Sequence, residues 1–214
     1  MAGWAEGILA EARRTLDLLK RRRLPEEAGP DANRLLALRR ELTRRIKDVS
    51  REGFGVVKTR HHGDYHLGQV LVVGSDFQII DFEGEPARPL AERRRKHSPL
   101  RDVAGMLRSF NYAIRSALMN FVADRAEPLE RLEPWITLWE ERTRQAFLEG
   151  YAEGVRGAAS YPENEVHARA LIELFTLEKA LYEIRYELDN RPDGVGIPIR
   201  GVLDLLGEPD GEES

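Results

Sequence analysis

The chain has no cysteine among its 214 residues. Disulfide bonds, thiolate metal sites and cysteine nucleophiles are therefore excluded, and a reducing compartment is favoured. Long hydrophobic runs are also absent, since none approaches the roughly 18 apolar residues that suggest a membrane-spanning helix. The first residues show no basic stretch followed by an apolar one, as a secretory leader would. We therefore expect a cytoplasmic protein without a membrane partner.

The chain also lacks a large excess of positive or negative charge. Lys and Arg number 33 and Asp and Glu number 37, so the formal net charge is −4 and the pI is about 5.8. Such a chain has no general electrostatic attraction to nucleic acid or to anionic lipid. Its length suits a single domain with a core of its own. We expect that domain over residues 1–207, followed by a disordered acidic tail over residues 208–214.

Reactive side chains concentrate between His61 and Glu85, which read HHGDYHLGQVLVVGSDFQIIDFEGE. The pattern predicts a loop, a strand over 70–73, a Gly-Ser-Asp turn, a strand over 77–80 and an acidic loop. Asp64 precedes the first strand and Asp81 follows the second, so a hairpin would bring both carboxylates to one end. Magnesium takes oxygen ligands and is usually held by one or two carboxylates together with substrate phosphates. The stretch therefore predicts a magnesium-nucleotide site.

The order of Asp64, Gln69 and Asp81 matches the pattern of a base, an amide metal ligand and an acidic metal ligand in phosphoryl-transfer enzymes. The segments H-G-D-x-H-x-G-Q and D-F-E-G resemble the aminoglycoside-phosphotransferase-like kinases, and among these the maltokinases, which are often fused to trehalose synthase. Residues 98–110 and 177–193 are similar to the same family. The resemblance implies a mostly α, α+β fold: the C-terminal lobe of a protein-kinase-like enzyme, with a β-hairpin carrying the site.

The resemblance also implies roles for these residues. Asp64 would orient or deprotonate the acceptor hydroxyl, and Gln69 and Asp81 would hold Mg²⁺ against the phosphates of ATP. His66 would contact either the bound substrate or nucleotide, or the backbone of the loop. Glu83 would reach the metal or remain a solvated acid.

Two further residues would support the site. His62 would orient the loop, although histidine beside glycine often only closes a turn. Asp102 lies in the first turn of a helix predicted to begin at Ser98 and Pro99, where a carboxylate is favoured by the helix dipole. The resemblance assigns Asp102 to holding the backbone of the catalytic loop.

A sugar acceptor is suggested by the last long helix. Glu178, Tyr182 and Tyr186 are each four residues apart, with Arg185 beside them, so they share one helix face. Flat aromatic rings and acids suit a sugar, and the resemblance makes it maltose, giving maltose 1-phosphate for α-glucan synthesis. The alternative is an amphipathic helix with tyrosines at its boundary. Gly194 stands where maltokinases often carry tryptophan, which departs from the family pattern.

A kinase also needs a glycine-rich loop over the phosphates and a strand lysine paired with a helix glutamate. Nothing upstream of Val56 offers them, because the early lysines lie in helical patterns. We therefore expect this chain to bind Mg-ATP weakly and to phosphorylate poorly or not at all by itself. Two other functions stay open: an inert kinase-like module associated with trehalose synthase, and a phosphotransferase for another small hydroxyl compound such as an aminoglycoside, choline or homoserine.

One aromatic stripe has no place in this hypothesis. Pro134 is expected to open a helix that carries Trp135, Leu138 and Trp139 near one face. Aromatic residues at helical spacing belong to a core more often than to a binding surface. We expect this face to be buried.

Overall fold

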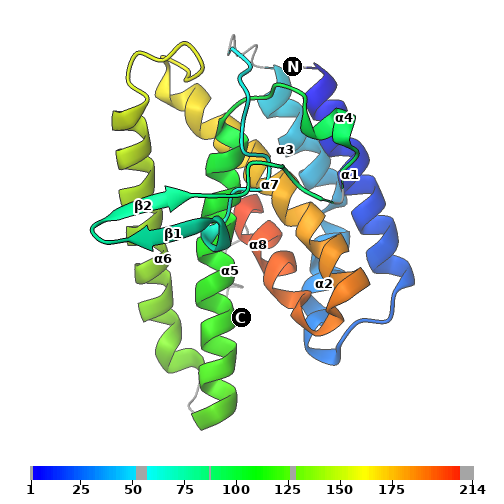
Figure 1. Ribbon diagram of the computed structural model, residues 1–214. Coiled ribbons are helices and arrows are strands. Elements are labelled where there is room, and N and C mark those ends of the chain that lie inside the picture. The colour runs from blue at the N-terminus through cyan, green and yellow to red at the C-terminus, as the bar shows by residue number, and fades with distance from the viewer. Residues whose placement is uncertain (1, 52–56, 87, 126–128, 208–214) are drawn as a thin grey trace. The chain divides into compact units, whose positions relative to one another are not determined.

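The computed structural model describes residues 2–51, 57–86, 88–125 and 129–207, and the tail expected over 208–214 lies outside them. The described residues form a mostly helical α+β structure with one two-stranded antiparallel hairpin (Figure 1). This confirms the coarse fold class, whereas the kinase-like C-terminal lobe over residues 1–207 stays a prediction. The chain divides into two compact units, residues 1–54 with 173–214, and residues 55–172. None of the described helices is long and apolar enough to cross a membrane.

The first unit is helical throughout its described part. Apolar residues recur every three or four positions along its helices, so each helix buries one face. Its elements are α1 (Ala2–Arg21), η1 (Glu26–Ala28), α2 (Gly29–Ala37), α3 (Arg39–Arg51), the later part of α7 (Glu165–Asn190), η3 (Pro192–Gly194) and α8 (Gly196–Leu206). The most buried side chains of this core include Ile8, Leu16, Leu35, Leu42, Ile46, Leu181, Ile184 and Ile199.

Helices α1 and α7 meet through both apolar and polar contacts. The Trp4 ring packs edge-on against Phe175, with centroids 5.4 Å apart. The buried Thr15 hydroxyl donates to the Leu181 carbonyl at 3.1 Å. A buried hydroxyl is thus paired, as the cost of an unpaired one requires.

The second unit carries the predicted site. Its elements are η2 (Leu67–Gln69), β1 (Val70–Val73), β2 (Asp76–Ile79), α4 (Leu90–Arg93), α5 (Leu100–Arg125), α6 (Leu129–Gly154) and the start of α7. Figure 1 shows α5 and α6 running antiparallel. Asn111 donates to Glu140 at 2.5 Å and Arg115 pairs with Glu133 at 2.5 Å, which fixes the register of the two helices.

The hairpin places the two ends of the site stretch together. Val70 pairs with Ile79 and Val73 with Asp76, and Gly74 turns the chain with φ of +62°. The second strand therefore begins one residue earlier than the sequence pattern predicts. Because β1 and β2 are adjacent and antiparallel, the residues just before β1 and just after β2 lie at the same end.

The expectation for the aromatic stripe of α6 is wrong in two respects. The helix begins at Leu129, with Pro134 inside it, and not at Pro134 itself. Trp135 and Trp139 are 71% and 42% exposed, so the face is not part of a core. The side of α6 that packs on α5 carries Ile136, which is buried.

Candidate active site

The loop before Asp64 is fixed to the first turn of α5. One carboxylate oxygen of Asp102 accepts a hydrogen bond from the His62 backbone N–H at 2.7 Å, and the other accepts from the Gly63 N–H at 2.9 Å. Gly63 has φ of +87°, a left-handed conformation that glycine adopts without strain. Hydrogen bonds to an ionised acceptor are stronger than neutral ones. Asp102 therefore holds the backbone of the two residues that directly precede Asp64.

The same face of α5 holds the next part of the loop. The Ser109 hydroxyl accepts from the Leu67 N–H at 3.0 Å. Gly105 lies under the Tyr65 carbonyl, since a Cβ atom built on Gly105 would be 2.7 Å from that oxygen. Sequence reasoning found Asp102 but missed Gly105 and Ser109. Gly105 comes three residues after Asp102 and Ser109 four residues after Gly105, and this spacing was the available signal because it places all three on one helix face.

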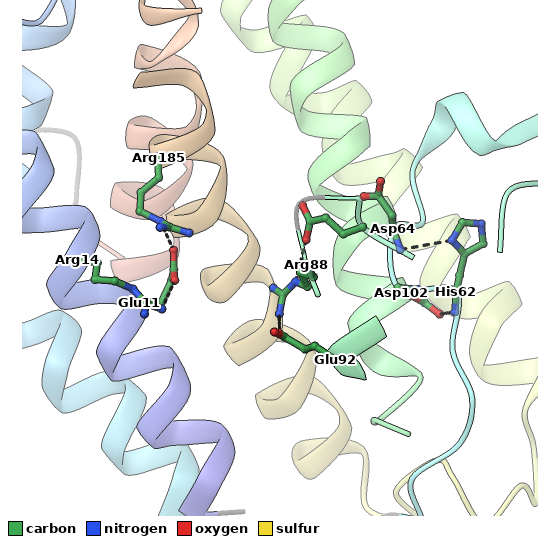
Figure 2. A network of polar contacts seen from close by, with 10 residues as sticks. Glu11, Arg14, His62, Asp64, Arg88, Glu92, Asp102 and Arg185 are labelled. Atoms are coloured by element: carbon green, nitrogen blue, oxygen red, sulfur yellow. Dashed lines mark hydrogen bonds and ion pairs between the residues drawn. The ribbon is translucent and has the colours of Figure 1, made fainter. Parts of the chain in front are cut away.

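A single imidazole ring links the two loops of the site. His62 Nδ1 accepts from the Asp64 N–H at 3.4 Å, and Nε2 lies 2.8 Å from the Ile80 carbonyl oxygen (Figure 2 shows His62, Asp64 and Asp102). These partners assign the ring proton to Nε2, which donates to Ile80. The ring is buried and packs on Phe82, with centroids 4.8 Å apart. His62 thus joins the backbone at Asp64 to the residue preceding Asp81.

The predicted metal ligands are neighbours. The Gln69 side-chain amide donates to Asp81 Oδ2 at 3.0 Å, and the Ile80 N–H donates to the Gln69 carbonyl at 3.0 Å. Asp81 has φ of +63°, which is uncommon for a residue other than glycine and recurs at functional sites. One carboxylate and one amide oxygen fit Mg²⁺, which keeps several water and phosphate ligands. Among the described residues no cluster of three His, Cys, Asp or Glu side chains could hold a metal by itself.

His66 faces the backbone of its own loop. Its Nδ1 accepts from the Gly68 N–H at 3.1 Å and caps the short helix η2. A Cβ atom at Gly68 would lie 2.8 Å from the His66 ring, so a larger residue there would displace the ring from its capping position. The sequence left open whether His66 contacts a bound molecule or the loop backbone, and in the structure it contacts the loop backbone.

Two arginines hold the segment that follows Asp81. The Arg93 guanidinium donates to the Glu83 carbonyl at 3.2 Å, and its alkyl part covers Gly84. Arg88 pairs with the buried Glu85 at 3.0 Å. It also pairs with Glu92, and Figure 2 shows these two side chains. The Glu83 side chain itself is exposed. These contacts fix the backbone that follows Asp81.

Titratable rings near the loop are held in their uncharged forms. Burial, with a smaller effect from Arg101, lowers the pKa of His97 to about 2. Burial also lowers the pKa of His61, whose ring centroid lies 5.7 Å from that of His97. His97 and Thr59 exchange two backbone hydrogen bonds of 2.9 Å. A charged imidazole there would oppose the packing that joins residue 59 to residue 97.

The residues predicted to bind the acceptor belong to the first unit. The rings of Tyr182 and Tyr186 stack with centroids 6.4 Å apart, and Glu178 is half-buried on the same helix. Arg185 donates to Glu11 at 2.5 Å, and Glu11 also pairs with Arg14 at 2.8 Å (Figure 2). Arg185 therefore links α7 to α1. Acceptor binding by these residues stays a prediction.

Comparisons with known proteins lead to glucosamine kinases. The chain is 29% identical over 177 residues to glucosamine kinase of Mycolicibacterium smegmatis (strain ATCC 700084 / mc(2)155), covering 81% of the chain and 41% of that protein. It is 24% identical over 147 residues to glucosamine kinase of Streptacidiphilus jiangxiensis, covering 69% and 31%. The chain thus spans less than half the length of these relatives. No family model matches.

Solved structures give the same result for the fold. A glucosamine kinase structure matches with a TM-score of 0.73 and 21% identity, over 96% of this chain and 46% of that one. A glucosamine kinase in complex with glucosamine, ADP and inorganic phosphate matches with a TM-score of 0.73 and 22% identity, over 96% and 44%. Nearly the whole chain therefore shares the fold of about half of a glucosamine kinase.

These findings overturn the resemblance to maltokinases, together with maltose as acceptor and trehalose synthase as partner. The curated relatives and the solved structures described above are glucosamine kinases. The error has a physical origin. The residues that carried the resemblance were those predicted to act as base, metal ligands and loop support, and a kinase of this kind would need such groups whatever its acceptor. The departure at Gly194 was the signal against maltokinase.

Proposed function

We propose that this chain is the half of an ATP-dependent sugar kinase that carries the general base and the metal ligands, and that its acceptor is an amino sugar such as glucosamine. One observation carries the proposal: the Gln69–Asp81 pair is tied to the Asp64 loop through His62. The match to a glucosamine kinase crystallised with glucosamine, ADP and phosphate supports it. An amino sugar thus takes the place of maltose, the acceptor that we expected from the sequence.

The chain's own residues would do the following. Asp64 orients the attacking hydroxyl of the sugar and accepts its proton. Asp102 and His62 hold the Asp64 backbone in place, which matters because positioning and electrostatics account for most of phosphoryl transfer. Mg²⁺ held by Gln69 and Asp81 would neutralise charge on the phosphoryl group being transferred.

An amino sugar is a cationic acceptor, which carboxylates favour. Asp64, Asp81 and Glu83 place three acids in the two loops that His62 joins. Asp64 is assigned to the hydroxyl and Asp81 to Mg²⁺, so the exposed Glu83 is the candidate for contact with the ammonium group.

The test compares glucosamine with maltose. Purified protein is mixed with Mg-ATP and each sugar, and ADP release is followed. We expect slow release that depends on glucosamine, absence of release with maltose, and a loss of at least about 100-fold in Asp64→Asn. Release that depends on maltose instead would refute the amino-sugar acceptor.

A binding measurement covers the case of very slow turnover. Mn²⁺ replaces Mg²⁺, and its electron paramagnetic resonance signal is recorded with ADP and protein. We expect a bound Mn-ADP signal that is lost in Asp81→Asn and kept in Asp76→Asn, since Asp76 lies at the opposite end of the hairpin. Absence of both Mn-ADP binding and glucosamine-dependent ADP release would refute the kinase function.

A further inference from the structure

The two loops of the proposed site touch through glycines. We call residues 61–64 the base loop and residues 81–84 the metal loop, after the roles proposed above. A Cβ atom built on Gly63 would lie 3.2 Å from the Cα atom of Gly84, so the two backbones are in direct contact. Both glycines are left-handed, with φ of +87° and +75°, a conformation that other residues rarely adopt. The contact therefore depends on the absence of side chains at both positions.

The side chain of Arg93 covers Gly84. A Cβ atom built on Gly84 would be 3.4–3.5 Å from the Cβ, Cγ and Cδ atoms of Arg93, which places the aliphatic stem against this glycine. The guanidinium donates to the Glu83 carbonyl at 3.2 Å and so ties the tip of the side chain to the metal loop. Gly84 is thus buried in contact with both Arg93 and the base loop.

Arginine is not the simplest residue for covering a glycine. The Arg93 Nε atom is buried and has no hydrogen-bond acceptor among the described residues. An unpaired buried donor destabilises the folded state, whereas a methionine would cover Gly84 without one. The guanidinium therefore serves the hydrogen bond to Glu83, and not the packing alone.

Asp81 lies between two connections to the base loop. His62 contacts the Ile80 carbonyl directly before Asp81, and Gly63 contacts Gly84 after it. Asp81 itself has an uncommon left-handed φ of +63°, and such a backbone persists only where its surroundings hold it. Loosening of either connection should therefore move the Asp81 carboxylate relative to the base loop.

We propose that Arg93 is a positioning residue, which clamps the metal loop onto the base loop and thereby sets the place of Asp81 relative to Asp64. The effect of this clamp on nucleotide binding rests on the proposed function, whereas the clamp itself does not. Phosphoryl transfer depends on where the base and the metal ligands are held, and a misplacement of about 1 Å can lower the rate by on the order of 100-fold.

Arg94 supplies a matched control. It directly follows Arg93, carries the same charge and is exposed. Arg93→Ala and Arg94→Ala each remove one positive charge from the same segment. A general electrostatic effect on an anionic nucleotide would appear in both variants, whereas loss of the clamp would appear in Arg93→Ala alone.

Amide hydrogen exchange, followed by NMR, tests the clamp without any ligand. The Gly63 N–H donates to Asp102 at 2.9 Å and its residue contacts Gly84, so this amide exchanges when the two loops separate. The amide of Ile184, which is fully buried on α7 in the first unit, corrects for changes in global stability.

We expect the Gly63 amide to exchange at least about tenfold faster in Arg93→Ala after this correction, and at an unchanged rate in Arg94→Ala. Arg93→Lys keeps a stem over Gly84 and a donor for Glu83, so it should restore most of the protection. An unchanged Gly63 rate in Arg93→Ala, or an equal increase in Arg94→Ala, would overturn the proposal. If Arg93→Ala fails to fold, Arg93→Met decides, because it keeps the stem and removes only the donor; an unchanged Gly63 rate in that variant overturns the proposal too.

Mn-ADP binding measures the consequence for the site. We expect its dissociation constant to rise at least about tenfold in Arg93→Ala, to change less than about twofold in Arg94→Ala, and to recover in Arg93→Lys. A loss of global stability alone would not move this constant while the protein stays folded. Unchanged affinity in Arg93→Ala would overturn the positioning role. If the unmodified chain binds no Mn-ADP, the proposed nucleotide site fails, and the exchange rate of Gly63 still decides whether Arg93 clamps the loops.

Discussion

Replacing Gly105 by alanine gives the sharpest test of how α5 supports the Asp64 loop. In an ordinary helix interior this change stabilises by about 1 kcal/mol, because glycine is a poor helix former. At Gly105 the added Cβ atom would lie 2.7 Å from the Tyr65 carbonyl oxygen. That oxygen belongs to the backbone, so it cannot rotate away as a side chain would.

The magnitude follows from the two opposing effects. Overpacking of a close contact costs typically 1–3 kcal/mol, which exceeds the propensity gain of about 1 kcal/mol in most of that range. We expect Gly105→Ala to destabilise by up to about 2 kcal/mol. The loop should also shift, weakening Mn-ADP binding.

Gly150→Ala is the matched control. Gly150 lies within α6, is exposed, and has nothing within 4 Å of a built Cβ atom. The Gly150→Ala variant should therefore be more stable than the unmodified protein by about 0.5–1 kcal/mol. Urea denaturation followed by circular dichroism compares the two variants. If both are stabilised equally, Gly105 does not hold the loop as described.

Three further predictions concern other contacts. Asp102→Ala leaves the backbone N–H groups of His62 and Gly63 without their acceptor. The variant should therefore remain folded, with a free energy of unfolding lower by roughly 2–4 kcal/mol and without any kinase activity. An unchanged urea midpoint would contradict this. Because the folded pKa of His97 lies at about 2, below its ordinary 6.5, its contribution is present above pH 6.5 and is lost as the pH falls toward 2. Lowering the pH from 7 to 5 should cost on the order of 2 kcal/mol, measured by urea titration, and His97→Asn should reduce this dependence; an equal dependence in both proteins would count against it. Glu11→Gln removes the buried carboxylate that pairs with Arg14 and Arg185, and it should lower the free energy of unfolding by roughly 1–3 kcal/mol. Glu6→Gln is the control, because Glu6 is exposed and its replacement should leave stability unchanged. Equal thermal midpoints for the two variants would show that the ion pairs of Glu11 contribute little.

The helices of the first unit were accessible from sequence because burial repeats every three or four residues. Leu35, Leu42 and Ile46 follow each other at intervals of seven and four residues, and all three are fully buried in the structure. The start of α2 was less accessible. Aspartate is a preferred N-cap residue, but α2 begins at Gly29, before Asp31, and Asp31 lies in its first turn, paired with Arg200. Local pattern does not reveal such a partner, which is 169 residues away along the chain.

At the site, sequence order predicted that Gln69 and Asp81 would approach, since a short hairpin has few alternative geometries. Gly105 and Ser109 were missed because their spacing from Asp102 places them on one helix face but does not show which segment of the chain lies over that face. The acceptor was mistaken because the loop motif predicts phosphoryl transfer and carries no information about the sugar.

The face of α6 shows why periodicity alone does not distinguish core from surface. Trp135 and Leu138 have the spacing of a buried stripe, yet they are exposed in the described structure. Periodicity reports that one side of a helix is apolar. Whether that side meets the rest of its own chain is decided by tertiary structure.

The backbone of Asp81 sets stability against function at a single position. Its φ of +63° disfavours any side chain, and glycine would adopt it without penalty. A thermostability screen of random variants would therefore enrich Asp81→Gly, a protein that resists heat better and has lost the carboxylate proposed to hold Mg²⁺. The carboxylate at this position would be retained only under selection for catalysis.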